Sequence, residues 1–104
     1  MFSVSNLNEK YQYNYSLRRP LGKIFLNSSF DRKDAFEIVS FIYDFVIANK
    51  WKWDRITYYK CKRIEFLIQE KVPANITNRR EIYLWIVNNW NKYVFPALDD
   101  ISLN

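Results

Sequence analysis

Residues 32–49 read RKDAFEIVSFIYDFVIAN, and their apolar side chains recur at the spacing of an α-helix. When successive residues are placed 100° apart, the polar side chains gather in one narrow arc and apolar side chains cover about 240°. Asp31 is the predicted N-cap, and Asp34 falls in the first turn, where an acidic side chain suits the helix dipole. A helix with so wide an apolar face is expected to pack on two sides. Its predicted polar arc consists of Lys33, Glu37, Ser40, Asp44 and Ala48.

A second helix is predicted from about residue 55 to 72. Asp54 is its expected N-cap and Pro73 its stop, because proline has no backbone N–H to donate. The connection after Asn49 contains no helix breaker, so one continuous helix over 32–72 is an alternative. The predicted inward face holds Ile56, Thr57, Cys61, Ile64, Leu67, Ile68 and Val72.

A third helix is predicted from about residue 79 to 94, and Asn78 and Glu81 have the spacing of a capping box at its start. Similar helix lengths and short links favour antiparallel neighbours. The sequence therefore predicts a mainly α-helical fold, an antiparallel three-helix bundle with helices at about 32–49, 55–72 and 79–94.

The first thirty residues have a different pattern. Tyr11, Tyr13 and Tyr15 alternate with polar residues, which is the period of a β-strand, and residues 23–26 could supply a partner strand. The pattern predicts either a short β-hairpin or an extended arm over about 11–27. The 104 residues are expected to form one globular domain, divided into an arm or hairpin (1–30), a helical bundle (31–95) and a tail (96–104).

The composition excludes several classes of chemistry. The chain has no His, which is the commonest general base and metal ligand, and only one Cys and one Gly. A single cysteine cannot form an intramolecular disulfide or a Cys-based zinc site, and one glycine cannot build a Gly-rich phosphate loop. We therefore expect a protein that is not an enzyme, with no catalytic residues, metal or cofactor. Cys61 is expected to be buried as a small apolar side chain.

Residues with AT-rich codons, such as Lys, Asn, Ile, Phe and Tyr, are abundant, as in AT-rich genomes of low-GC bacteria, their phages and mobile elements. This bias raises the numbers of Lys and Tyr without a functional cause. No uncharged apolar run is long enough to span a bilayer, and the N-terminal residues lack the pattern of a signal peptide. The expected location is the cytoplasm, with no membrane partner.

The strongest candidate binding segment is residues 50–63, KWKWDRITYYKCKR, with six basic residues, one acid and four aromatics. Nucleic-acid sites use this mixture because cations neutralise phosphates and aromatic rings stack on bases, and Trp, Tyr and Arg also dominate protein interfaces. The alternative is that the aromatic residues complete the core and the lysines form a solvated face. The predicted binding residues are Lys50, Trp51, Lys52, Trp53, Arg55, Tyr59, Lys62, Arg63 and Phe66.

Arg79 and Arg80 at the start of the third predicted helix oppose the helix dipole, so they are a candidate contact for an anion. The alternative is that both arginines are solvated.

Two hypotheses for the function follow. The first is a small helical protein that binds and inhibits or neutralises a partner protein, as phage inhibitors and immunity proteins do. The second is a nucleic-acid-binding regulator that uses the same basic and aromatic face, for which the net charge of +5 is moderate. Formation of a homo-oligomer through exposed aromatic residues is a third, weaker hypothesis.

Overall fold

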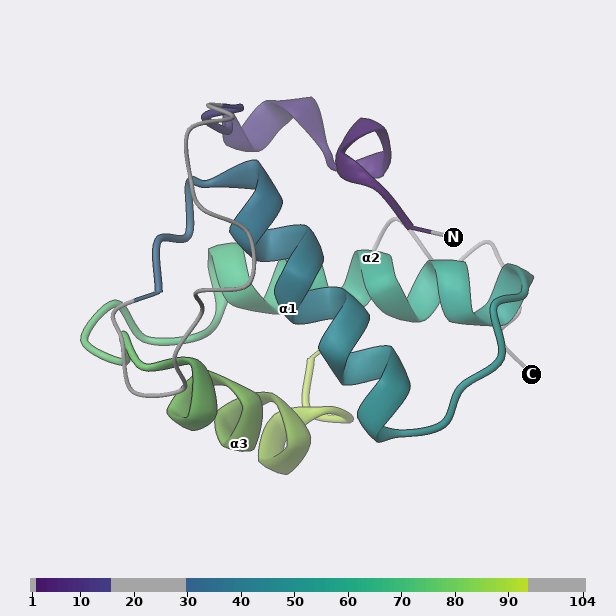
Figure 1. Ribbon diagram of the computed structural model, residues 1–104. Coiled ribbons are helices and arrows are strands. Elements are labelled where there is room, and N and C mark those ends of the chain that lie inside the picture. The colour runs from purple at the N-terminus through teal and green to yellow at the C-terminus, as the bar shows by residue number, and fades with distance from the viewer. Residues whose placement is uncertain (1, 16–29, 94–104) are drawn as a thin grey trace.

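The computed structural model describes residues 2–15 and 30–93 (Figure 1). Two short 3₁₀ helices come first, η1 at Val4–Asn6 and η2 at Glu9–Tyr11. The three α-helices that follow are α1 at Ala35–Ala48, α2 at Arg55–Glu70 and α3 at Arg79–Asn89. The prediction of a mainly helical fold with three helices is confirmed.

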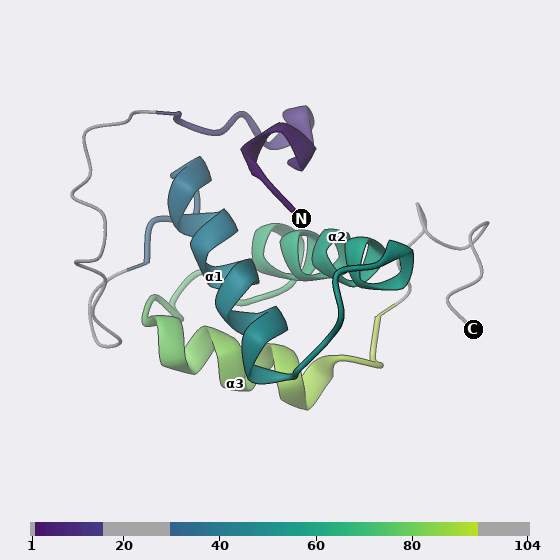
Figure 2. The ribbon, with the colours of Figure 1, turned by 45° about the vertical axis from the view of Figure 1, so that its right-hand side comes forward.

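The helices are arranged in a way that is compatible with a helical bundle (Figures 1 and 2). In both views α2 and α3 run in opposite directions, and α1 lies across them. The N-terminal segment, residues 2–15, and α3 lie on opposite sides of the α1–α2 pair. As the wide apolar face predicted, α1 is packed from more than one side. Its buried apolar residues are Ala35, Ile38, Phe41, Ile42, Phe45 and Val46.

The first and second helices are separate, which removes the alternative of one continuous helix. The backbone leaves the helical path at Lys50, where φ is 56°, and Trp51 N then donates to Val46 O at 3.1 Å. Asp54 caps α2 as predicted, because its Oδ1 accepts from Thr57 N at 2.9 Å. Asn78 likewise caps α3 through its side-chain oxygen. Both α2 and α3 end earlier than predicted, at Glu70 and Asn89.

The N-terminus of α1 corrects the sequence prediction. Asp34, and not Asp31, is the N-cap, since Asp34 Oδ1 accepts from Phe36 N at 3.0 Å and from Glu37 N at 3.2 Å. The helix starts later because a distant segment binds the backbone just before it. Asn14 N donates to Lys33 O at 2.6 Å, and Ala35 N donates to Asn14 O at 2.9 Å.

Arg32 joins the start of α1 to the end of α2 and to the link before α3. Its Nη1 donates to the carbonyls of Ile68 at 2.9 Å and Val72 at 2.8 Å. Its Nη2 donates to the carbonyls of Pro73 at 2.6 Å and Ile76 at 2.7 Å. Carbonyls at a helix C-terminus have no partner within the helix, so one guanidinium satisfies several of them at once.

Neither the predicted hairpin nor the predicted extended arm is supported by the described residues. The described residues contain no strand: residues 9–11 form η2, and Asn14 makes only an isolated bridge with Asp34. The alternation of Tyr11 and Tyr13 has another cause, since both hydroxyls donate to carboxylates of α2. The partner strand proposed at 23–26 and the tail at 96–104 lie outside the described residues.

A buried carboxylate holds the N-terminal segment against α2. Glu65 is 1% exposed, and its Oε2 accepts from Asn8 N at 2.8 Å and from Tyr13 OH at 2.9 Å. Lys62 Nζ lies 3.7 Å from Glu65 Oε1 and donates to Asn6 O at 2.7 Å. Burial, and then the Glu65 charge, raises the pKa of Tyr13 above its ordinary value.

Replacing Arg32 by Met tests the four hydrogen bonds that Arg32 donates to the end of α2 and the link before α3. The variant keeps an unbranched side chain but leaves four carbonyls without their charged donor, so we expect the free energy of unfolding to fall by about 3 kcal/mol in urea titrations. Arg80→Met, at an exposed arginine, is the matched control and should change it by less than about 0.5 kcal/mol. Equal effects of the two substitutions would contradict the role of Arg32.

Replacing Tyr13 by Phe tests the contact with Glu65. Loss of a hydrogen bond to a buried carboxylate should cost about 2 kcal/mol of unfolding free energy at pH 7. Because the folded-state pKa is raised, the Tyr13 contribution is complete below about pH 10 and is lost above it, as the unfolded phenol ionises first. The variant should therefore show a shallower decline in stability above about pH 10. Tyr15→Phe, at an exposed ring, is the control for stability at pH 7. If stability fell with pH above about 10 as steeply in Tyr13→Phe as in the unchanged protein, the contact between Tyr13 and Glu65 would be contradicted.

Candidate functional site

The two tryptophans of the link between α1 and α2 have different surroundings. Trp51 packs against Phe45 and Trp90, with ring centroids 5.6 and 5.8 Å away, and Lys60 Nζ lies 4.5 Å from the centroid of the indole. Trp53 instead stacks on Tyr43 of α1, with centroids 5.9 Å apart and planes 23° from parallel. Tyr43 is 41% exposed. Both indoles are half-buried against the core, and Trp53 in addition meets the exposed ring of Tyr43.

A cavity of about 300 Å³ adjoins Trp53. Arg55 at the start of α2 is exposed, and its guanidinium lies 5.9 Å from the ring centroid of Tyr59. Lys50 and Lys52 are exposed as well. We call Tyr43, Lys50, Lys52, Trp53 and Arg55 the Trp53 surface. The cavity is lined by Phe2, Asn6, Trp53, Asp54, Arg55 and Tyr58.

The remaining predicted binding residues are directed to contacts within the fold. Lys62 contacts the N-terminal segment as described above. Arg63 Nη1 donates to Trp90 O at 3.2 Å, and its guanidinium lies 5.3 Å from the centroid of the Trp90 ring. Phe66 is half-buried against the core, with Lys71 Nζ 5.9 Å from its ring centroid. The structure therefore keeps Trp53 and Arg55 together at one cavity and turns Lys62, Arg63 and Phe66 to other neighbours.

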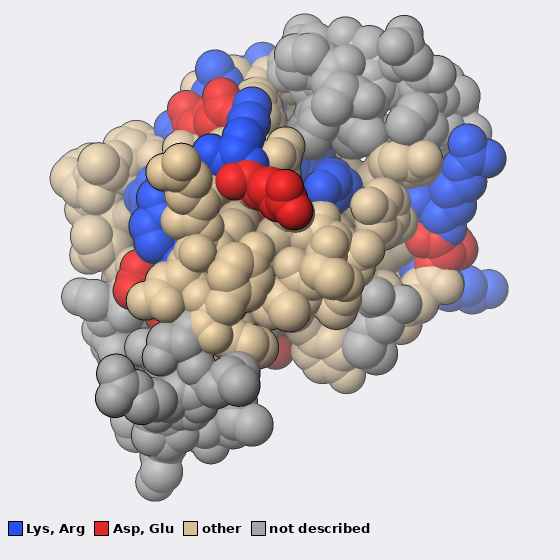
Figure 3. All heavy atoms as spheres, turned by 90° about the horizontal axis from the view of Figure 1, so that it is seen from above, with Lys and Arg blue, Asp and Glu red and all other residues tan. Residues whose placement is uncertain are grey.

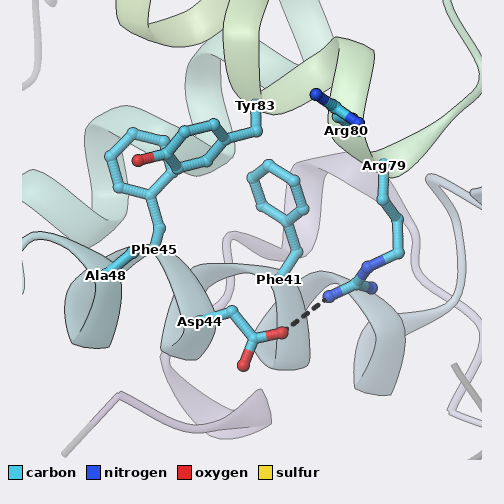
Figure 4. A pocket seen from close by; sticks show the side chains of 7 residues that line it. All are labelled: Phe41, Asp44, Phe45, Ala48, Arg79, Arg80 and Tyr83. Carbon is cyan, nitrogen blue, oxygen red and sulfur yellow. Dashed lines mark hydrogen bonds and ion pairs between the residues drawn. The ribbon is translucent and has the colours of Figure 1, made fainter. Parts of the chain in front are cut away.

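A second pocket, of about 180 Å³, lies between α1 and the start of α3 (Figure 4). Its apolar lining comes from Phe41, Phe45, Ala48 and Tyr83, and the Phe45 and Tyr83 ring centroids are 4.8 Å apart. We call it the Arg79 pocket. Asp44, Arg79 and Arg80 supply its charged lining.

Arg79 is buried, so the alternative that both arginines are solvated is wrong for Arg79. It is 4% exposed, and its guanidinium lies 5.5 Å from the ring centroids of both Phe30 and Phe41. Its Nη2 donates to Asp44 Oδ2 at 3.1 Å, and its Nη1 lies 3.9 Å from Glu37 Oε2. Glu37, which was predicted on the polar arc of α1, is 2% exposed, because Arg79 of α3 brings a positive charge to that face. Arg80 is exposed, as the solvated alternative expected.

Sequence reasoning did not find several residues of these two sites. Phe2 and Asn6 reach the Trp53 cavity only because the N-terminal segment folds back onto α2, for which the sequence carries no local signal. Ile56 was predicted to face inward and is 39% exposed at the first turn of α2. Tyr43 was missed as well, although its position beside the polar arc of α1 is a signal of exposure that could have found it.

Residues 2–15 and 30–93 contain no group of three His, Cys, Asp or Glu side chains that could hold a metal ion. Cys61 is fully buried, as predicted, and burial raises the pKa of its thiol to about 12. Among the described helices, none is long and apolar enough to cross a membrane.

Comparisons with protein-family models, with curated proteins and with solved structures found no match to this chain.

Proposed function

We propose that this protein is a non-enzymatic binding protein that engages a partner protein through the Trp53 surface and thereby inhibits or neutralises it. The observation that carries the proposal is the Tyr43–Trp53 stack beside a cavity of about 300 Å³. Interface energy concentrates in Trp, Tyr and Arg side chains that border such pockets. A partner can place one side chain in the cavity while its neighbours cover the exposed face of Tyr43.

The charges around Trp53 support an acidic surface on the partner. Lys50, Lys52 and Arg55 are exposed, and the structure shows no ion pair for their side chains among the described residues. Asp54 is the one acid that lines the cavity, and its carboxylate already accepts the Thr57 N–H at the start of α2. The cations therefore outnumber the acid and would steer a negatively charged protein toward the surface.

Nucleic-acid binding is the competing hypothesis, and the contacts of α2 weigh against it. Binding to phosphates requires a row of free cations, because each neutralised phosphate adds to the affinity. Lys60 lies over Trp51, Lys62 bonds to Asn6 O and Arg63 bonds to Trp90 O, so these three cations are held within the fold. On the face that carries the N-terminal segment, Figure 3 shows basic and acidic side chains next to one another.

Site-specific crosslinking tests the proposed surface. The full chain would carry the photoreactive p-benzoylphenylalanine at position 43 and be irradiated in a nuclease-treated extract of the native host. We expect a crosslinked partner protein whose yield falls at least about tenfold in the Trp53→Ala, Arg55→Glu double variant, since each removes a contact of hot-spot size. The same photoreactive residue at position 84 is the control, because Leu84 is 48% exposed on α3 and should give no such product.

Three results would contradict this assignment. One is an unchanged crosslink in the double variant, provided that circular dichroism shows it to be folded. Another is a crosslink to a second copy of this chain. The third is a gel shift of mixed-sequence DNA or RNA that disappears in the Lys52→Glu, Arg55→Glu variant and weakens steeply with salt, which would support nucleic-acid binding instead.

A further inference from the structure

The Arg79 pocket combines aromatic walls with guanidinium groups at one end. Phe41, Phe45 and Arg79 are buried and form its floor, whereas Ala48 and Arg80 are exposed at its rim. Figure 4 shows the Phe41, Phe45 and Tyr83 rings gathered between α1 and α3, with Asp44 and Arg79 joined at one edge. The pocket thus offers an apolar contact and a charged contact to the same ligand.

The size of the pocket sets the size of the apolar group. An apolar cavity of about 150 Å³ is known to hold one benzene molecule, and this pocket measures about 180 Å³. A single six-membered ring can therefore enter it. Such a ring would meet Phe41, Phe45 and Tyr83 in the edge-to-face or offset-stacked contacts that aromatic rings favour.

The charges of the pocket select an anion over a cation. Two arginines and one aspartate line it, and Asp44 is already bonded to Arg79. The buried Nη1 of Arg79 faces Glu37 Oε2 at 3.9 Å, so Arg79 is balanced by two acids. The exposed Arg80 guanidinium has no ion-pair partner among the described residues and is the unbalanced charge of the pocket. Arginine presents paired N–H donors that match a carboxylate, so both guanidinium groups suit this anion.

We propose that the Arg79 pocket binds an aromatic group that carries a carboxylate. The ring lies against Phe41, Phe45 and Tyr83, and the carboxylate binds Arg80 and the Nη2 of Arg79, which now donates to Asp44. Because the Asp44 side chain is 68% exposed, it can turn into solvent when the ligand carboxylate takes its place on Arg79. This inference concerns a different surface from the Trp53 surface and does not depend on the proposed partner protein.

Titration of the full-length, ¹⁵N-labelled chain with 3-phenylpropionate tests the inference at pH 7 and constant ionic strength. We expect saturable amide shifts in the second half of α1 and the first turn of α3, with a Kd of about 1 mM or tighter. Arg80→Gln should weaken binding about tenfold, because it removes one charged contact. Asp44→Asn should tighten binding several-fold, since it removes the anion that competes for Arg79. Lys92→Gln, an exposed cation after α3, is the matched control and should leave the Kd unchanged.

Further ligands and one further variant decide between the explanations. The Ala48→Trp substitution at the exposed rim should block the pocket and abolish binding in a chain that circular dichroism shows to be folded. Equal binding of the uncharged 3-phenylpropanamide, tighter binding of 3-phenylpropylamine, weaker binding by Asp44→Asn, or no saturable shift would each overturn the proposal.

Binding of a short peptide that ends in Phe tests whether the natural ligand is a polypeptide C-terminus or a free aromatic acid. If the free-acid peptide binds at least about tenfold tighter than 3-phenylpropionate and its C-terminal amide does not, the pocket recognises a polypeptide C-terminus. If the small acid binds as well as the peptide, the pocket recognises a free aromatic acid. Both results support the assigned chemistry.

Discussion

The Arg32 guanidinium is the contact on which the arrangement of the helices depends. It lies just before α1, yet its donors reach the carbonyls at the end of α2 and in the link to α3. A further hydrogen bond links the same two segments, because Gln69 Nε2 of α2 donates to Arg32 O at 2.7 Å. Helix ends normally leave their carbonyls to water or to caps. Here one side chain supplies those donors, so the end of α2, the turn into α3 and the start of α1 are held at one point.

Buried acids account for two of the cations that the sequence suggests for a partner, Lys62 and Arg79. Glu65 and Glu37 are almost fully buried, and a buried carboxylate is costly unless donors or cations surround it. Glu65 therefore draws in the N-terminal segment and Lys62, and Glu37 is accompanied by Arg79. Lys62 and Arg79, which the sequence suggests as contacts for a partner, therefore compensate buried acids of the same chain. What remains exposed is confined to short groups such as Lys50, Lys52 and Arg55.

The same contacts divide the candidate segment into two parts. Trp51 and Trp53 look equivalent in the sequence, and both are half-buried against the core, but they meet different neighbours. Trp51 packs on Phe45 and Trp90, whereas Trp53 stacks on the exposed Tyr43 ring and borders a cavity. Arg79 and Arg80 are divided in a similar way. Arg79 turns inward between Phe30 and Phe41, and Arg80 stays outside. Adjacent residues of the same type therefore have different roles at each site.

The sequence alone determined the three helices, the caps Asp54 and Asn78, and the burial of Cys61, because helix periodicity and capping depend on residues a few positions apart. Only the tertiary structure decided the cap of α1, the burial of Glu37 and the neighbours of Lys62 and Arg63. Each of these depends on a residue far along the chain: Asn14 for the start of α1, Arg79 for Glu37, and Asn6 and Trp90 for the two cations. Local spacing shows which face of a helix a side chain occupies, and the fold decides which charge or ring meets it there.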